Sequence, residues 1–379
     1  MRTVIAIETF DPRRGGAERE AFGLARELAR RGHEVAVVAE RADPEAASAA
    51  GVAALVPVPR RLLPRGVRAW RLARAARRVA REREAPALVA FARVPGATVT
   101  VPHGGLHLAS LFGSASRRET AAGRALHLAV RLIAPRQAAL LALERAALTA
   151  PATRFVAVSR RVRDDLVRLG GVAPERVALC PNGADIERFR PASPDGRRAA
   201  RRALGEPEDG PLVLFASNHF ALRGLGGALE AVARAAVRPR LVVAGRGRPG
   251  RFARAAARLG IADRVRFLGP VADLGSCLAA ADLLLHPTFY DPCSLVTLEA
   301  LAAGVPVVTT AANGAAELFA GDEGAVVEDA RDAAALAAAL DGLVRAPGAR
   351  AAARATAERH PEAAAVARVA DAVEAAACR

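Results

Sequence analysis

Short apolar runs alternate with longer amphipathic stretches along most of the chain. In the first half, apolar runs of strand length occur at residues 3–7, 34–39, 155–158 and 177–179. Residues 17–31, which follow the first of these runs, have the periodicity of an amphipathic helix. A second series of strands, again separated by helices, is predicted at residues 212–215, 240–244, 265–268, 283–286 and 305–309. Strands that alternate with helices are typical of parallel sheets, so the pattern predicts an α/β fold.

The two series of strands are separated by residues 188–210, which are rich in proline, glycine and charge. A chain of 379 residues is longer than a single hydrophobic core usually supports, so two domains are expected. The stretch between the two series of strands is therefore predicted to be a linker. The predicted domains are residues 1–187 and 211–360, and residues 361–379 form a final helix with no strand after it.

The composition, 52% hydrophobic and 25% charged, is that of a globular protein. No run of about 18 apolar residues is free of charges or helix breakers, so neither a spanning helix nor a signal peptide is predicted. Cytoplasmic localisation is the expectation. The four cysteines, Cys180, Cys277, Cys293 and Cys378, lack disulfide-framework or metal-ligand spacing, and no metal site is expected.

The basic residues are all arginine, and they are unevenly distributed. Residues 1–190 hold 33 arginines against 18 acidic residues, whereas the rest holds 22 against 21. Ten of the arginines lie between Arg60 and Arg83, where alanine, leucine and valine recur on one helical face. This basic amphipathic helix has two open interpretations, contact with an anionic membrane surface or packing on its own domain.

Two glycines, Gly15 and Gly16, separate the first predicted strand from the first helix. Glycine lets a backbone approach a ligand closely, and the start of a helix offers N–H groups to an anion. The pair therefore suits a phosphate, although a double glycine also forms ordinary tight turns.

The densest group of chemical side chains lies in residues 286–300, where a strand ends and a helix begins. Asp291 precedes that helix, and Glu299 lies eight positions later, about two helical turns along. Free N–H groups around Ser294, Leu295 and Val296 would meet a phosphate at the helix start. The alternative is that Asp291 only caps the helix and Glu299 lies on the surface.

The Asp-x7-Glu spacing, followed by Ala-Ala-Gly-Val-Pro-Val-Val at residues 302–308, resembles the Glu-x7-Glu signature of family 4 retaining glycosyltransferases. Further motifs agree in order, so that the resemblance covers nearly the whole chain, at residues 15–18, 31–35, 156–159, 181–185 and 314–317. Residues 285–299 are most similar to the bacterial lipopolysaccharide core heptose glucosyltransferases.

The resemblance implies a GT-B fold, in which two Rossmann-like domains face each other across a cleft and the C-terminal helix crosses back to the first. By the same resemblance, Glu299 would hold the ribose hydroxyls and Asp291 the hydroxyls of the transferred sugar. The backbone of Ser294, Leu295 and Val296 and the side chain of Arg223 would bind the diphosphate.

Two positions depart from the family pattern. Asp291 is one methylene shorter than the usual Glu, and Arg223 stands where a lysine is usual, with no second basic residue beside it. His103 resembles the family's histidine near the reacting sugar, with His107 as the other choice and a structural histidine as the plain alternative.

The activity implied is retaining, metal-independent hexosyl transfer, with glucose from UDP-glucose as the expected donor and no cofactor. The acceptor would be a lipopolysaccharide core sugar or another lipid-linked envelope glycan, reached by peripheral binding to the inner face of the cytoplasmic membrane. A mannosyl- or N-acetylhexosaminyltransferase of the same fold is the alternative within this class.

Residues 245–250 match G-x-G-x-x-G and raise the alternative of an NAD-dependent oxidoreductase. No acidic residue closes the next predicted strand, however, and Pro249 is unusual in a pyrophosphate turn. Arg246 to Pro249 also resembles an AT-hook core, but the few aromatic residues offer little for base stacking, so no nucleic-acid partner is expected. A non-catalytic binding protein is the remaining alternative.

Overall fold

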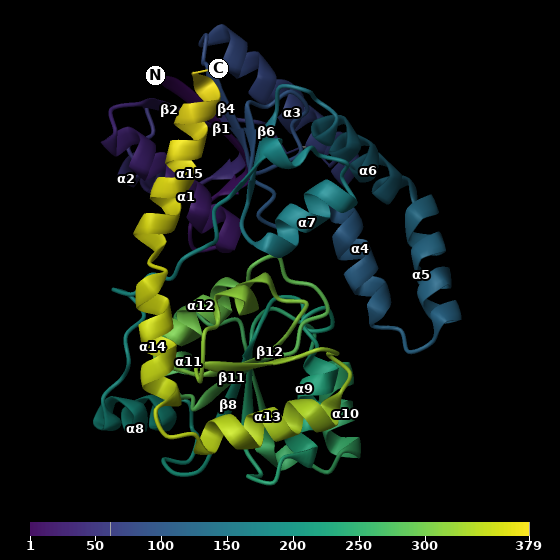
Figure 1. Ribbon diagram of the computed structural model, residues 1–379, viewed down its shortest axis with the longest axis vertical. Helices are drawn as coiled ribbons and strands as arrows, with labels where there is room; N and C mark the ends of the chain where they lie inside the picture. Colours follow the sequence, from purple (N-terminus) through teal and green to yellow (C-terminus); the bar gives the residue numbers. More distant parts are fainter. Residues whose placement is uncertain (61, 379) are drawn as a thin grey trace. The chain divides into compact units, whose positions relative to one another are not determined.

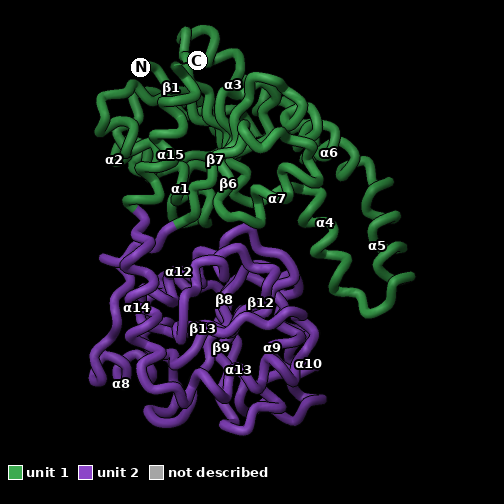
Figure 2. The backbone as a smooth tube through the Cα atoms, viewed as in Figure 1, with its two compact units in different colours: residues 1–182, 363–379 green, residues 183–362 purple. Residues whose placement is uncertain are grey.

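The computed structural model describes residues 1–60 and 62–378, which form two compact units. Unit 1 comprises residues 1–182 and 363–379, and unit 2 comprises residues 183–362 (Figure 2). Every strand pair assigned in the two sheets is parallel, which confirms the predicted α/β class.

Unit 1 contains a seven-stranded sheet in the order β3-β2-β1-β4-β5-β6-β7. Its strands are β1 (Arg2–Phe10), β2 (Glu34–Ala42), β3 (Ala54–Pro57), β4 (Ala87–Ala90), β5 (Val99–Thr100), β6 (Arg154–Ala157) and β7 (Val177–Leu179). Its helices are α1 (Gly16–Arg30), α2 (Pro44–Ala49), α3 (Arg65–Glu82), α4 (His107–Ser116), α5 (Ala121–Ile133), α6 (Pro135–Leu148), α7 (Arg160–Arg168), the short η1 (Pro174–Arg176) and α15 (Glu362–Ala377) (Figure 1).

Unit 2 contains a six-stranded sheet in the order β10-β9-β8-β11-β12-β13. Its strands are β8 (Leu212–Ala216), β9 (Arg240–Ala244), β10 (Val265–Gly269), β11 (Leu283–His286), β12 (Val307–Thr310) and β13 (Gly324–Val327). Its helices are α8 (Pro194–Ala203), α9 (Leu225–Arg234), α10 (Gly250–Arg258), η2 (Ala262–Arg264), α11 (Leu274–Ala280), α12 (Leu295–Ala302), η3 (Gly314–Leu318), α13 (Ala333–Arg345) and α14 (Ala349–Arg359).

The segment predicted as a linker, residues 188–210, lies within unit 2 and contains a helix. The hydroxyl of Ser193 accepts a hydrogen bond from the N–H of Gly196, and Pro194 occupies the first turn of α8. Some of the residues that suggested a linker therefore form the start of a helix. Arg201 on this helix is buried and donates to the main-chain oxygens of Ala280 and Gly210.

The basic helix predicted between Arg60 and Arg83 forms as α3, but its apolar face is already used. Leu72, Ala76 and Val79 are buried in the core of unit 1 against residues of β1, β2 and β4. The arginines Arg74, Arg77 and Arg78 point outward and are exposed. Packing on its own domain is therefore the correct interpretation for the apolar face of this helix.

The predicted C-terminal helix forms as α15, and its residues from Ala363 onward belong to unit 1. Arg31 after α1 donates to Asp371 at 2.7 Å and to Glu374 at 2.9 Å, and His33 contacts the second oxygen of Glu374 at 2.7 Å. Arg379, the last residue of the predicted segment, lies outside the described residues.

One close approach in unit 2 gives a stability prediction. Gly224 has a φ of +79°, and a Cβ atom placed on it would lie 1.9 Å from the main-chain oxygen of Pro287. Gly224→Ala should therefore destabilise the protein by roughly 3 kcal/mol or more. Gly226→Ala, in the first turn of α9 with nothing within 4 Å of the added atom, is the matched control and should be neutral or slightly stabilising. Thermal unfolding of both variants tests this, and equal melting temperatures would contradict it.

Candidate active site

The order of the strands in the sheet of unit 2 reverses between β8 and β11. These two strands are paired in the sheet, although they are three strands apart in the chain. In such sheets, ligands bind outside the carboxyl ends of the strands at this switch point. The loop after β8 contains Arg223, and the loop after β11 contains Asp291. The topology therefore brings these two predicted residues together from positions far apart in the sequence.

Asp291 is buried and has two basic side chains beside it. Its Oδ2 atom lies 3.3 Å from Nη1 of Arg223 and 3.0 Å from Nε2 of His286. The same Arg223 nitrogen also donates to the main-chain oxygen of Tyr290. Asp291 is thus held by an ion pair and by a histidine, rather than acting as a helix cap.

His286 ends β11 and is fully buried, with its ring stacked on Phe215. Burial lowers the pKa of this histidine, and the hydrogen bond and charge of Asp291 oppose the shift only in part. A neutral ring has one N–H, and an ionised carboxylate only accepts, so Nε2 carries the proton and donates it to Asp291. Sequence reasoning gave His286 no role, although its place five residues before Asp291 at a strand end was a usable signal.

The start of α12 differs from the prediction in one respect. The hydroxyl of Ser294 accepts the N–H of Thr297 and caps the helix, while the N–H of Ser294 donates to Asn313 at 3.2 Å. Ser294 therefore does not offer its backbone donor to a phosphate in this arrangement. Leu295 and Val296, in the first turn, are left as the two predicted backbone donors.

Asn313 holds this helix start from the end of β12. Besides accepting from Ser294, it donates to the hydroxyls of Thr297 and Thr309 at 3.0 and 3.1 Å. The main chain of Asp291 pairs with it as well, since an isolated bridge joins the two residues. Sequence reasoning missed Asn313, because its role depends on a contact between loops that follow different strands.

Glu299 lies on α12 and is only 4% exposed, which excludes the alternative that it is a surface residue. It shares this helix with the predicted donors Leu295 and Val296, and the loop before the helix carries Asp291. The arrangement thus gathers two buried carboxylates, one guanidinium and a helix N-terminus at the switch point. Such a set can bind a polyhydroxyl group and a diphosphate.

The glycines of the G-x-G-x-x-G match have a packing role. A Cβ atom on Gly245 would lie 1.8 Å from the main-chain oxygen of Ser217, and one on Gly247 would lie 2.3 Å from the ring of Phe220. Both glycines therefore let the loop after β9 pack against the loop after β8. The AT-hook resemblance lies in this same packed loop and not in a free arm.

In unit 1, the predicted glycines lie at the start of α1, where Gly15 is an extended N-cap without a side-chain hydrogen bond and Gly16 is the first helical residue. His103 follows β5, and its Nε2 atom lies 3.0 Å from Glu20 Oε2 and 3.3 Å from Asn182 Nδ2. His107 begins α4 and pairs with Gln137. Both histidines line one pocket of about 270 Å³, so the structure leaves both in position to meet a ligand.

Two units, each with a parallel sheet covered by helices, have the architecture of the GT-B glycosyltransferases. Residues 14–188 match the domain described as Glycosyltransferase Family 4, and residues 210–346 match Glycosyl transferases group 1. The chain therefore belongs to the family 4 glycosyltransferases.

Curated relatives match only part of the chain. D-inositol 3-phosphate glycosyltransferase 2 of Catenulispora acidiphila is 36% identical over 211 residues, which are 52% of this chain and 49% of that protein. The D-inositol 3-phosphate glycosyltransferase of Streptomyces bingchenggensis is 38% identical over 178 residues, 43% of this chain and 39% of its own length. The chain thus spans about half or less of these relatives.

Solved structures match along nearly the whole chain. WaaG, a glycosyltransferase involved in lipopolysaccharide biosynthesis, has a TM-score of 0.82 at 24% identity and covers 98% of this chain and 99% of its own. Anabaena HepE in complex with UDP-glucose has a TM-score of 0.74 at 19% identity, with 99% of both chains covered. These likenesses establish the GT-B fold.

Burial of His286 gives a pH prediction. Its pKa in the folded protein lies below the ordinary 6.5, so below that pH the unfolded chain binds more protons than the folded one. The free energy of unfolding should therefore fall as the pH drops from 7.5 to 5.5, by up to about 1.4 kcal/mol per pH unit for one histidine. Urea unfolding at both pH values should show a smaller fall in His286→Gln, whereas the exposed control His219→Gln keeps the wild-type fall. An unchanged fall in His286→Gln would contradict this assignment.

Proposed function

We propose that the protein transfers a hexose, glucose from UDP-glucose, to an envelope glycan acceptor with retention of anomeric configuration and without a metal. The observation that carries this proposal is the pairing of Asp291 with Arg223 at the switch point, beside the start of the helix that bears Glu299. Glu299 would hold the ribose, Asp291 the transferred sugar, and Leu295, Val296 and Arg223 the diphosphate.

Arg223 links the two halves of the donor site. A diphosphate would compete with Asp291 for its guanidinium, so donor binding would draw Arg223 away and free carboxylate capacity for sugar hydroxyls. In the transfer step, the acceptor oxygen forms a bond to the anomeric carbon on the face that the diphosphate leaves. The departing phosphate oxygen takes the acceptor proton, and Arg223 with the helix N-terminus stabilises the growing charge.

The acceptor is proposed to be a lipopolysaccharide core sugar or another lipid-linked glycan that carries phosphate. The strongly basic first half of the chain supports an anionic acceptor. The partial relatives support a second candidate, a soluble inositol phosphate, because both named above are called D-inositol 3-phosphate glycosyltransferases. A mannosyl or N-acetylhexosaminyl donor is the alternative to glucose.

Calorimetry with UDP-glucose, UDP-N-acetylglucosamine, GDP-mannose and NAD tests the donor assignment. Wild-type protein should bind UDP-glucose, and Glu299→Ala should weaken binding at least tenfold through loss of the ribose contact, about 1.4 kcal/mol. Glu317→Ala, outside the proposed donor contacts, is the control. Binding of NAD alone would revive the oxidoreductase alternative, and binding of no nucleotide would support a non-catalytic binding protein.

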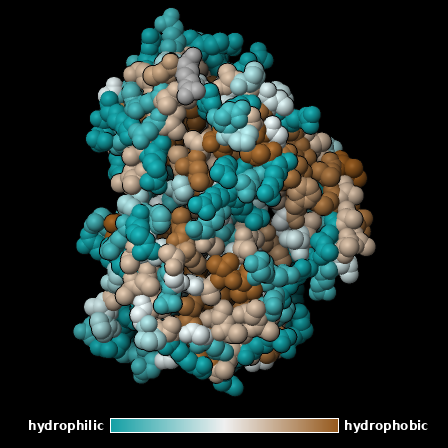
Figure 3. All heavy atoms as spheres, viewed as in Figure 1, coloured by the Kyte–Doolittle hydropathy of each residue, from teal (hydrophilic) through white to brown (hydrophobic). Residues whose placement is uncertain are grey.

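We also propose peripheral binding to the anionic inner face of the cytoplasmic membrane, with α5 as the contacting element. None of the thirteen residues of α5 is buried, and Leu126, Val130 and Ile133 are 67%, 56% and 79% exposed. Hydrophobic residues gather at the right-hand edge of Figure 3, over α5 and α6. Arg124 and Arg131 on the same helix supply positive charge. No single described helix is long and apolar enough to span a membrane, whereas α5 and α6 together pass that test with a bend of 80° between them.

Vesicle sedimentation tests this membrane contact. Binding to vesicles that contain phosphatidylglycerol should exceed binding to phosphatidylcholine alone and should weaken with salt. A double variant, Leu126→Ser with Ile133→Ser, should lose most of the binding, whereas Leu169→Ser, an exposed leucine of the same unit, should keep it. Equal partitioning onto both kinds of vesicle would contradict the proposal.

A further inference from the structure

The pocket that contains His103 and His107 also holds two arginines whose charge the proposed donor chemistry does not use. It opens at the carboxyl ends of β4 and β5, the edge where parallel sheets bind ligands, and has a volume of about 270 Å³. Arg65 and Arg93 belong to its polar lining, together with Ser110 and Glu144, while Phe91, Leu148 and Leu166 are among its apolar walls. This volume is close to the lower end of the range of roughly 300–1,000 Å³ that is usual for small-molecule sites, and so fits a ligand no larger than a phosphorylated ring.

Arg93 lies in the loop after β4, and its Nε atom is buried without a hydrogen-bond partner among the described residues. Arg93 also forms an ion pair with Glu144, whose Oε1 atom lies 3.4 Å from Nε. Burying this N–H without a hydrogen-bond acceptor has a cost that the ion pair with Glu144 offsets only in part. An anionic ligand in the pocket would remove that cost.

Glu144 offsets the charge of Arg93 through their ion pair, and its carboxylate is also engaged by backbone donors. It accepts the N–H groups of His107 at 2.7 Å and Leu108 at 3.3 Å, and so occupies the positive N-terminus of α4. An incoming anion therefore cannot use this helix start and has to be bound by side chains. Arg65, which is about half exposed and pairs with Glu8 at 3.5 Å, is the second cation of the pocket.

The positive potential of the two arginines is felt inside the pocket. Burial is the main cause of the lowered pKa of His107. The hydrogen bond with Gln137 and the charge of Glu144 oppose this shift, whereas the charges of Arg93 and Arg65 add to it. His107 is therefore neutral near pH 7 and adds no positive charge of its own. The two guanidinium groups provide the attraction for an anion, and Arg93 has the planar donor geometry that matches a phosphate.

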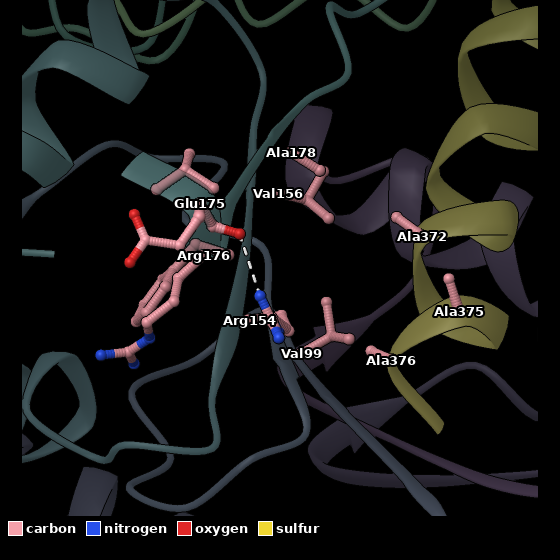
Figure 4. A pocket seen from close by; sticks show the side chains of 11 residues that line it. Val99, Arg154, Val156, Glu175, Arg176, Ala178, Ala372, Ala375 and Ala376 are labelled. Atoms are coloured by element: carbon pink, nitrogen blue, oxygen red, sulfur yellow. Dashed lines mark hydrogen bonds between the residues drawn. The ribbon is translucent and has the colours of Figure 1, made fainter. Parts of the chain in front are cut away.

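The other pocket described in unit 1 shows the contrast. It has a volume of about 200 Å³ and lies at the amino ends of β5 and β6, against alanines of α15 (Figure 4). Arg154 donates there to the main-chain oxygen of Glu175 at 2.9 Å, and Arg176 donates to the oxygens of Thr153 and Ala150. Both of these arginines donate hydrogen bonds to main-chain oxygens, so their guanidinium groups are already used and this pocket offers no comparable anion site.

We infer that Arg93, assisted by Arg65, forms a subsite for a phosphate monoester carried by the acceptor. The inference rests on the proposed function, since it assigns the acceptor's anionic group to this pocket. The phosphate can belong to a soluble ring phosphate or to a phosphorylated glycan on a lipid, because the recognition chemistry is the same.

The test compares phosphorylated and unphosphorylated probes in the presence of saturating UDP. D-inositol 3-phosphate and glucose 6-phosphate are titrated against inositol and glucose by calorimetry, and phosphorylated lipopolysaccharide is compared with its dephosphorylated form. Wild type should bind at least one phosphorylated probe ten or more times tighter than its parent. Preference confined to the lipopolysaccharide pair identifies the lipid-linked source, and preference among the soluble probes identifies the soluble one.

Variants then assign the preference to residues. Arg93→Gln should reduce it at least tenfold, Arg65→Gln less, and Arg93→Lys should restore part of it by keeping the charge without the planar fork. Arg74→Gln, an exposed arginine of α3 that does not line the pocket, should behave as wild type. Each variant is first shown to melt at the wild-type temperature and to bind UDP normally.

Two results would overturn the inference. The first is a wild type that binds no phosphorylated probe more tightly than its parent, and the second is Arg93→Gln with an unchanged preference. Failure of the proposed donor function looks different, because UDP binding itself is then absent from the wild type.

Discussion

The approach of the loop after β8 to the loop after β11 is the constraint on which the candidate active site depends. Gly224 passes so close to the main-chain oxygen of Pro287 that no side chain fits, and this closeness puts Arg223 within ion-pair distance of Asp291. The two loops lie close together because they follow neighbouring parallel strands, whose carboxyl ends lie at the same edge of the sheet. The pairing of Arg223 with Asp291 thus follows from the topology of the sheet.

Buried polar groups then fix the details at that edge. His286 holds Asp291, and Asn313 ties the start of α12 to the end of β12, so that each residue restrains a loop belonging to another strand. In a low-dielectric interior such bonds are strong and costly to leave unmade, which favours one arrangement of the site. Asp291, whose side chain is one methylene shorter than the glutamate usual in the family, is positioned by His286 and Arg223.

Unit 1 repeats the topology with different chemistry. Its pocket also opens at the carboxyl ends of parallel strands, but a carboxylate, Glu144, fills the start of α4, whereas the start of α12 in unit 2 is proposed to bind the donor diphosphate. Anion binding in unit 1 is consequently left to the guanidinium groups of Arg93 and Arg65. The same fold can thus offer backbone donors in one unit and side-chain donors in the other.

The sequence alone determined the α/β class, most of the strands and the grouping of Asp291 with Glu299, because hydrophobic period and motif spacing are local properties. It missed β3, β4 and β13, which are short, and it took residues 188–210 for a linker although Ser193 and Pro194 start a helix there. Only the tertiary structure decided the partners of Asp291, the contact of Ser294 with Asn313 and the convergence of Arg93 with Arg65. Those depend on contacts between loops of different strands, which no local pattern encodes.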